Sequence, residues 1–196
     1  MRTKLQNLIS YLKARPHIAA SQAKKMGISP VELKRWCDLG KIHRLSRGYY
    51  GLETLSTAPE QLVSMINQPC AMAGISALIH YGYTNAIGNH AWVLVPNGYP
   101  PINRPDIETM RQTKRNYDLG LTKIDTNWGQ ILITDREKTL IDALRGRYLD
   151  TEEKLRVLKR WLRDPKKNKD NFNKYKSRIR LGSEYSNWIM TIEAET

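Results

Sequence analysis

The chain has 196 residues, 40% of them hydrophobic, and a formal net charge of +13 at pH 7 with an isoelectric point near 9.8. This composition excludes a largely disordered chain, and no apolar run approaches the roughly 18 residues that a membrane-spanning helix needs. A strongly basic surface attracts polyanions, so the charge indicates a nucleic acid as a partner.

The first residues contain no long apolar segment and no small-residue cleavage site of the kind that marks a secretory signal peptide. The chain has two cysteines, Cys37 and Cys70, each in a segment whose pattern predicts burial. Two isolated thiols suit a reducing compartment better than a disulfide-stabilised fold. We therefore expect a cytoplasmic protein without membrane contact.

The positive charge is concentrated at the two ends of the chain. Residues 1–58 hold 11 Lys and Arg against 3 Asp and Glu, a net charge of +8. Residues 59–150 hold 9 of each kind, and residues 151–196 hold 12 against 7, a net charge of +5. The change from basic to neutral coincides with a polar stretch near residues 53–59, which predicts a linker between two domains.

The first predicted helix is amphipathic and ends before Pro16. Its apolar residues, at i, i+3, i+4 and i+7, are Leu5, Leu8, Ile9 and Leu12. Ser21 is placed to cap a short second helix, and Gly27 permits a tight turn after it. A short helix followed by a glycine turn predicts the first half of a helix-turn-helix.

The third predicted helix covers residues 30–39 and has the clearest local signals. Ser29 and Glu32 form a capping box, Pro30 suits the first helical position, and Gly40 ends the helix. Its inward residues are predicted to be Ile28, Leu33 and either Trp36 or Cys37, and its outward residues Val31, Lys34, Arg35 and Asp38. The outward face is suited to a DNA major groove, as a recognition helix.

The segment KIHRLSRGYYGL predicts a short hairpin around Ser46 and Gly48, from which Arg44 and Arg47 project. Helix, turn, capped basic helix and hairpin, in that order, indicate a winged helix-turn-helix at residues 1–55. The alternative is an ordinary three-helix domain with a surface hairpin, whose arginines do not bind DNA.

The predicted second domain, residues 59–196, mixes helices and strands, so the expected fold class is α+β. Helices are expected near residues 59–67 and 74–82, a buried strand at residues 91–96, and a hairpin of strands at residues 121–125 and 130–134. Thr134 and Glu137 then predict a capped helix, and Asp150 and Glu153 another. The chain from about residue 150 is predicted to form basic amphipathic helices, either ordinary surface helices or a surface for an acidic protein or the DNA backbone.

The motifs of common enzymes are absent from the sequence, and the four histidines have no metal-ligand spacing. The nearest approach to a catalytic site is the set Asp135, Glu137 and Asp142 with Lys138, which could serve a metal-dependent nuclease. Asp135 and Glu137 fall at the first turn of a predicted helix, where acidic side chains stabilise the helix dipole, so their presence needs no catalytic role. We expect no enzyme activity, no cofactor and no metal.

Three stretches, RLSRGYY, GISALIHYGYT and ILITDREKTLIDAL, resemble segments of the AbiEi-type antitoxins of bacterial type IV toxin-antitoxin systems. The resemblance covers most of residues 18–145. It implies a cytoplasmic repressor that binds inverted repeats in its own promoter and opposes a nucleotidyltransferase-like toxin. The alternatives are a winged-helix transcriptional regulator without a toxin partner and, less favoured, a DNA-binding nuclease.

Seven residues are predicted to contact double-stranded DNA: Lys24, Lys25, Ser29, Lys34, Arg35, Arg44 and Arg47. Lys34 and Arg35 are expected to reach base edges or phosphates from the recognition helix. Ser29 is expected to bind a phosphate at the helix N-terminus. Lys24, Lys25, Arg44 and Arg47 are expected to contact phosphates and so to position the protein on the DNA.

Overall fold

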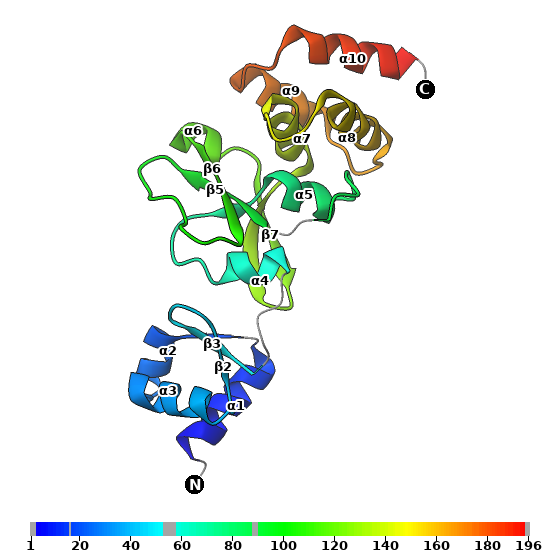
Figure 1. Ribbon diagram of the computed structural model, residues 1–196. Coiled ribbons are helices and arrows are strands. Elements are labelled where there is room, and N and C mark those ends of the chain that lie inside the picture. The colour runs from blue at the N-terminus through cyan, green and yellow to red at the C-terminus, as the bar shows by residue number, and fades with distance from the viewer. Residues whose placement is uncertain (1–2, 16, 53–57, 88–89, 195–196) are drawn as a thin grey trace. The chain divides into compact units, whose positions relative to one another are not determined.

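The computed structural model describes residues 3–15, 17–52, 58–87 and 90–194. These residues form helices and two β-sheets, so the chain has a mixed α and β fold (Figure 1). It divides into two compact units, the first Met1–Met65 with Asp125–Gln130 and the second Ile66–Ile124 with Ile131–Thr196. Across the described residues, no helix combines the length and apolar character needed to cross a membrane.

The first unit packs its helices on a small sheet. Its elements are α1 (Lys4–Ala14), β1 (Ile18–Ala19), α2 (Ala20–Lys25), α3 (Pro30–Asp38), β2 (His43–Ser46), β3 (Tyr49–Gly51) and α4 (Pro59–Ser64). The sheet order is β1-β3-β2, and both pairings are antiparallel. The core is formed by Leu8, Leu12, Ile18, Ala23, Ile28, Leu33, Trp36 and Ile42.

The local signals at α3 are confirmed. The hydroxyl of Ser29 accepts a hydrogen bond from the Glu32 N–H, the Glu32 carboxylate accepts one from the Ser29 N–H, and Pro30 lies in the first turn. The cap predicted for α2 is wrong, because that helix begins at Ala20 and its N-cap, Ala19, makes no side-chain hydrogen bond. β1 brings Ala19 into a pairing with Tyr49, and this long-range pairing sets where α2 begins.

The second unit combines a mixed sheet with a group of helices. Its elements are β4 (Ala71–Met72), α5 (Gly74–His80), β5 (Ala91–Pro96), β6 (Ile107–Gln112), α6 (Lys114–Tyr117), β7 (Leu121–Thr126), β8 (Gly129–Thr134), α7 (Arg136–Arg145), α8 (Thr151–Arg163), α9 (Lys169–Arg178) and α10 (Ser183–Ala194). The turn between β7 and β8 groups with the first unit. The sheet order is β6-β5-β4-β8-β7, with β5 parallel to β6, β4 antiparallel to β5, and β4 parallel to β8.

Helix α7 forms the centre of the second unit. Residues 137–144 are all buried, and the helix packs against α5, α8 and α9 (Figure 1). Its predicted cap is corrected by one residue, because Asp135 is the N-cap and accepts a hydrogen bond from the Lys138 N–H. The hydroxyl of Thr134 instead lies 2.7 Å from the hydroxyl of Thr139.

Helix α5 packs closely through its small residues. Gly74 has a φ of +52°, and a Cβ there would lie 2.8 Å from the ring of Trp92. Ser76 and Ala77 are buried, whereas Ile79 is 37% exposed.

Candidate nucleic-acid interface

The N-terminus of α3 is closed by the chain's own groups. The Glu32 carboxylate accepts hydrogen bonds from the Ser29 N–H at 2.7 Å and the Ser29 hydroxyl at 2.9 Å, and Lys4 Nζ lies 3.1 Å away. The bond from the Ser29 backbone is the largest of the effects that lower the pKa of Glu32 to about 2. Because a carboxylate already occupies this helix end, the geometry favours a capping role for Ser29 over a phosphate contact.

The outer face of α3 carries the predicted basic residues. Leu33 and Trp36 are buried on one side, while Val31, Lys34 and Arg35 are exposed on the other. The predicted division of the helix into two faces is therefore confirmed. Lys34 and Arg35 lie in successive positions and extend from the middle of the helix into solvent.

The hairpin β2–β3 and the end of α2 supply the other basic side chains. Arg44 is paired across the hairpin with Tyr50, and the register shifts between Arg44 and Ser46. Gly48 has a φ of +83°, a conformation that side-chain-bearing residues rarely adopt, and permits the turn that exposes Arg47. Lys24 and Lys25 are exposed in the last turn of α2.

The six predicted basic contacts are Lys24, Lys25, Lys34, Arg35, Arg44 and Arg47. In the part of the chain that the structure describes, none of these six side chains takes part in an ion pair. In the described part of the first unit, the ion pair present joins Lys4 to Glu32. The charges of the six side chains are therefore exposed and are not paired with an acidic side chain within the described chain.

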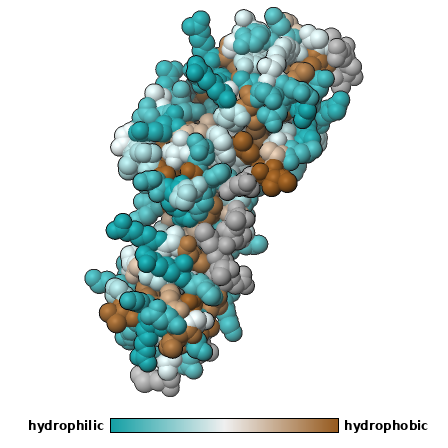
Figure 2. Space-filling view, viewed as in Figure 1, coloured by the Kyte–Doolittle hydropathy of each residue, from teal (hydrophilic) through white to brown (hydrophobic). Residues whose placement is uncertain are grey.

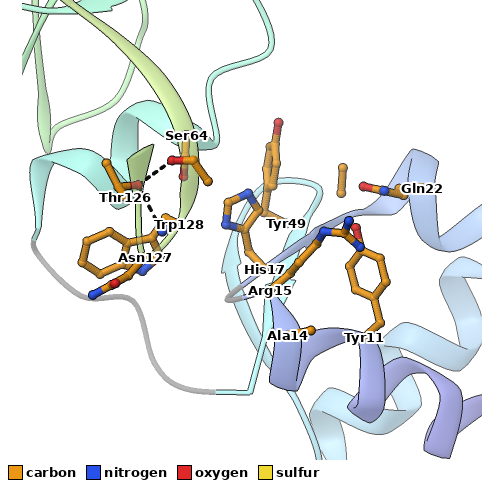
Figure 3. Close-up of a pocket in the computed structure, with 12 residues that line it drawn as sticks. Tyr11, Ala14, Arg15, His17, Gln22, Tyr49, Ser64, Thr126, Asn127 and Trp128 are labelled. Atoms are coloured by element: carbon orange, nitrogen blue, oxygen red, sulfur yellow. Dashed lines mark hydrogen bonds between the residues drawn. The ribbon is translucent and has the colours of Figure 1, made fainter. Parts of the chain in front are cut away.

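A further cluster in the first unit was not predicted. Figure 3 shows Tyr11 and Arg15 from the end of α1 beside His17 and Tyr49 from the paired β1 and β3 region. The guanidinium of Arg15 lies 4.8 Å from the centre of the Tyr11 ring, and the rings of His17 and Tyr49 lie 5.7 Å apart, edge to face. Burial lowers the pKa of His17. The residues come from separate elements, so no local sequence pattern could have revealed the cluster.

The carboxylates of α7 hold the second unit together. Asp135 accepts hydrogen bonds from the Lys138 N–H at 2.8 Å and the Tyr175 hydroxyl at 2.7 Å. Glu137 accepts them from the indole N–H of Trp161 at 3.2 Å and the Asn168 N–H at 2.8 Å. Burial raises the pKa of Asp135 above its usual range. The two side chains connect α7 to α8 and α9.

Lys138 and Asp142 form a buried ion pair, with side chains 0% and 2% exposed. Lys138 Nζ also donates to Oε1 of Gln112 at 2.8 Å, and Nε2 of Gln112 donates to Asp142 at 2.9 Å. Burial lowers the pKa of Lys138 against the opposing effect of Asp142. The three carboxylates considered for a nuclease thus all bind internal donors. Across the described residues there is no group of three or more His, Cys, Asp or Glu placed to hold a metal ion.

Two of the stretches that carry the family resemblance contact each other. The Tyr81 hydroxyl donates to the carbonyl of Thr134 at 2.9 Å, and the Arg136 guanidinium lies 4.7 Å from the centre of the Tyr81 ring. Arg136 and Tyr83 both bind Asp164 at the end of α8, at 2.9 and 2.6 Å. The polar residues of both stretches therefore serve packing between α5, α7 and α8.

Hydrophilic residues cover most of the face seen in Figure 2, with apolar residues in small separate areas. No protein-family model and no curated protein sequence matches the chain. Among solved structures, it is similar to the crystal structure of the RV2827C protein from Mycobacterium tuberculosis, with a TM-score of 0.63 and 13% identity over 90% of this chain and 72% of that chain. At this identity, the similarity concerns the fold alone.

Proposed function

We propose that the protein is a DNA-binding antitoxin of the AbiEi type, a repressor of its own operon that opposes a nucleotidyltransferase-like toxin. The first unit acts as a winged helix-turn-helix, with α2 and α3 as its helices and β2–β3 as its wing. The observation that carries the DNA-binding part is the set of six exposed basic side chains without ion pairs in the described chain. The element order α1-β1-α2-α3-β2-β3, with an antiparallel sheet in the order β1-β3-β2, supports the same proposal.

In this proposal α3 lies in the major groove with Lys34 and Arg35 at the base edges. Arginine in particular recognises guanine through two parallel hydrogen bonds. Arg44 and Arg47 of the wing contact phosphates or enter the minor groove. Lys24 and Lys25 also contact phosphates. Ser29 holds the helix end as its cap.

Salt dependence tests the DNA-binding part. If about five to eight phosphates are neutralised, the logarithm of the binding constant falls against the logarithm of salt concentration with a slope of about −5 to −7. The measurement is fluorescence anisotropy of the full chain with DNA from upstream of its own gene. A slope near zero would contradict the proposed interface.

The antitoxin part rests on the resemblance of the second-unit stretches to the AbiEi family. Its test is co-expression of the full chain with the product of the adjacent reading frame, which should be a nucleotidyltransferase-like toxin. The matched variant Lys34→Glu/Arg35→Glu should lose DNA binding yet still restore growth, because the substitutions lie only in the first unit. DNA binding without any rescue by the unmodified chain would favour the plain transcriptional regulator.

A further inference from the structure

An open cavity of about 390 Å³ lies in the second unit, at the carboxyl ends of two parallel strands. β5 ends at Pro96 opposite Gln112, the last residue of β6, and the Asn97 N–H donates to the carbonyl of Gln112 at 2.7 Å. In open sheets with helices, ligands bind outside the carboxyl ends of parallel strands, where loops and helix ends supply the contacts. The backbone topology therefore places the cavity in a position suited to a ligand.

The side chains around this cavity are rich in hydrogen-bond donors. Those relevant here are Asn97, Arg111, Gln112, Asn116, Asp142 and Arg145. They come from the ends of β5 and β6, from α6 and from the last turns of α7. The amides of Asn97 and Asn116 and the guanidinium of Arg145 accompany a single carboxylate, that of Asp142, so the lining offers more donors than acidic groups to an acceptor-rich ligand.

The inner wall of the cavity is held rigidly. Asp142 and Gln112 bind each other at 2.9 Å, and both bind the buried ammonium group of Lys138. A buried ion pair that is fully hydrogen-bonded resists movement, because breaking it leaves a charge without compensation. Two lining side chains are therefore fixed before any ligand arrives, which lowers the entropic cost of binding.

The charge around the cavity is positive. Lys138 neutralises Asp142, and Arg111 and Arg145 are exposed at the cavity with no acidic side chain paired to them among the described residues. Arg111 donates to the carbonyl of Tyr99 at 2.9 Å, which fixes its direction while leaving other N–H groups for a ligand. The planar guanidinium group of arginine can bind a phosphate through two parallel hydrogen bonds.

We propose that this cavity binds a mononucleotide, with Arg145 at the phosphate and the amides of Asn97 and Asn116 at the base or sugar. Its volume falls within the roughly 300–1,000 Å³ of small-molecule sites, and its lining combines polar and apolar surface. Amide groups pair with the donor and acceptor edge of a nucleobase. The site is separate from the proposed DNA contacts and does not depend on them.

The test is isothermal titration of the full chain with AMP, GMP, CMP, UMP and inorganic phosphate. At least one nucleotide should bind with a 1:1 stoichiometry and a dissociation constant of about 10 μM to 1 mM. Arg145→Gln should weaken that binding by about tenfold or more, through loss of a charge-assisted contact. The matched control is Arg115→Gln, an exposed arginine on α6 that does not line the cavity, and it should leave binding unchanged.

The variant Asn116→Ala shows whether the cavity recognises a whole nucleotide or only a phosphate group. It should weaken nucleotide binding several-fold and leave inorganic phosphate unaffected. Thermal unfolding of each variant checks that the fold is retained, and the exposed position of Arg145 makes that substitution mild. The proposal is overturned if no nucleotide binds with a dissociation constant below about 1 mM, if Arg115→Gln weakens binding as much as Arg145→Gln, or if Asn116→Ala has no effect on nucleotides.

Discussion

The charged residues of α3 and of α7 have opposite environments. On α3, Lys34 and Arg35 are exposed and have no ion-pair partner in the described chain, whereas on α7 Lys138 and Asp142 are buried and bound to each other. A buried charge is costly unless it is paired and hydrogen-bonded, so the charges of α7 are committed to the fold. Exposed charges contribute little to folding, so those of α3 can act on a ligand.

The same comparison separates two candidate functions that depend on charged residues. A nuclease would need carboxylates open to a metal ion and substrate, but Asp135 and Glu137 each accept two hydrogen bonds from within the second unit. DNA binding needs accessible positive charge, which the first unit presents. Burial and internal hydrogen bonds therefore count against a nuclease site at Asp135 and Glu137, and exposure favours a binding role for the basic residues of the first unit.

The largest expected effect is on the stability of the second unit. Lys138→Met leaves Asp142 buried without its partner, and we expect a loss of about 3–5 kcal/mol in the free energy of unfolding, measured by urea denaturation followed by circular dichroism. The double variant Lys138→Met/Asp142→Leu should recover most of that loss, because both charges are removed. A loss below about 1 kcal/mol in the single variant would show that Lys138 is not needed to stabilise the buried carboxylate of Asp142.

A smaller loss of stability is expected from a substitution at Gly120, which is closely surrounded by side chains at the start of α7. It has a φ of +64°, and a Cβ would lie 2.7 Å from Cβ of Lys138 and 2.9 Å from Oδ1 of Asp135. Gly82 is the matched control, with a φ of +72° and no heavy atom within 4 Å of the corresponding Cβ. Gly82→Ala should cost about 1–2 kcal/mol from the backbone alone, and Gly120→Ala about 1–3 kcal/mol more from the contacts. Equal losses in urea denaturation would refute the tight packing at Gly120.

The smallest effect concerns pH and the cap of α3. The pKa of Glu32 is about 2 in the folded chain, below its ordinary value of 4.5, so ionised Glu32 stabilises the first unit above pH 4.5. That contribution should decline as pH falls from about 4.5 towards 2, whereas Glu32→Gln keeps the cap but has no such pH dependence. Nuclear magnetic resonance titration of the Glu32 carboxyl carbon checks the value, and a midpoint near 4.5 would show that the capping box and Lys4 do not act on it.

The features that sequence could predict are those whose causes are local. The capping boxes at Ser29 and Asp150 and the buried strand β5 follow from residues within a few positions of each other. The start of α7 was predicted one residue early because Thr134 and Asp135 are both good caps. The choice between them depends on the contact of Thr134 with Thr139 and of Asp135 with Tyr175, and the second partner lies on a different helix.

The features that sequence analysis missed depend on distant partners. β1 and β4 are two residues long and exist through pairing with β3, β5 and β8, so they carry no periodicity of their own. β6 has only one buried residue, Ile107, and lacks an alternating pattern. The connection between Gln112 and the pair Lys138 and Asp142 joins a strand to a helix and cannot be read from spacing.

The most direct measurement of the proposed DNA interface is competition binding of three variants on the promoter DNA and on single-base variants of it. Arg35→Ala should lose about 1–3 kcal/mol of discrimination at one base position, and Arg47→Ala should weaken binding evenly across sequences. Lys123→Ala, an exposed lysine on β7, is the matched control and should bind like the unmodified chain. Equal binding profiles for all three variants would contradict the assignment of DNA recognition to α3 and the β2–β3 hairpin.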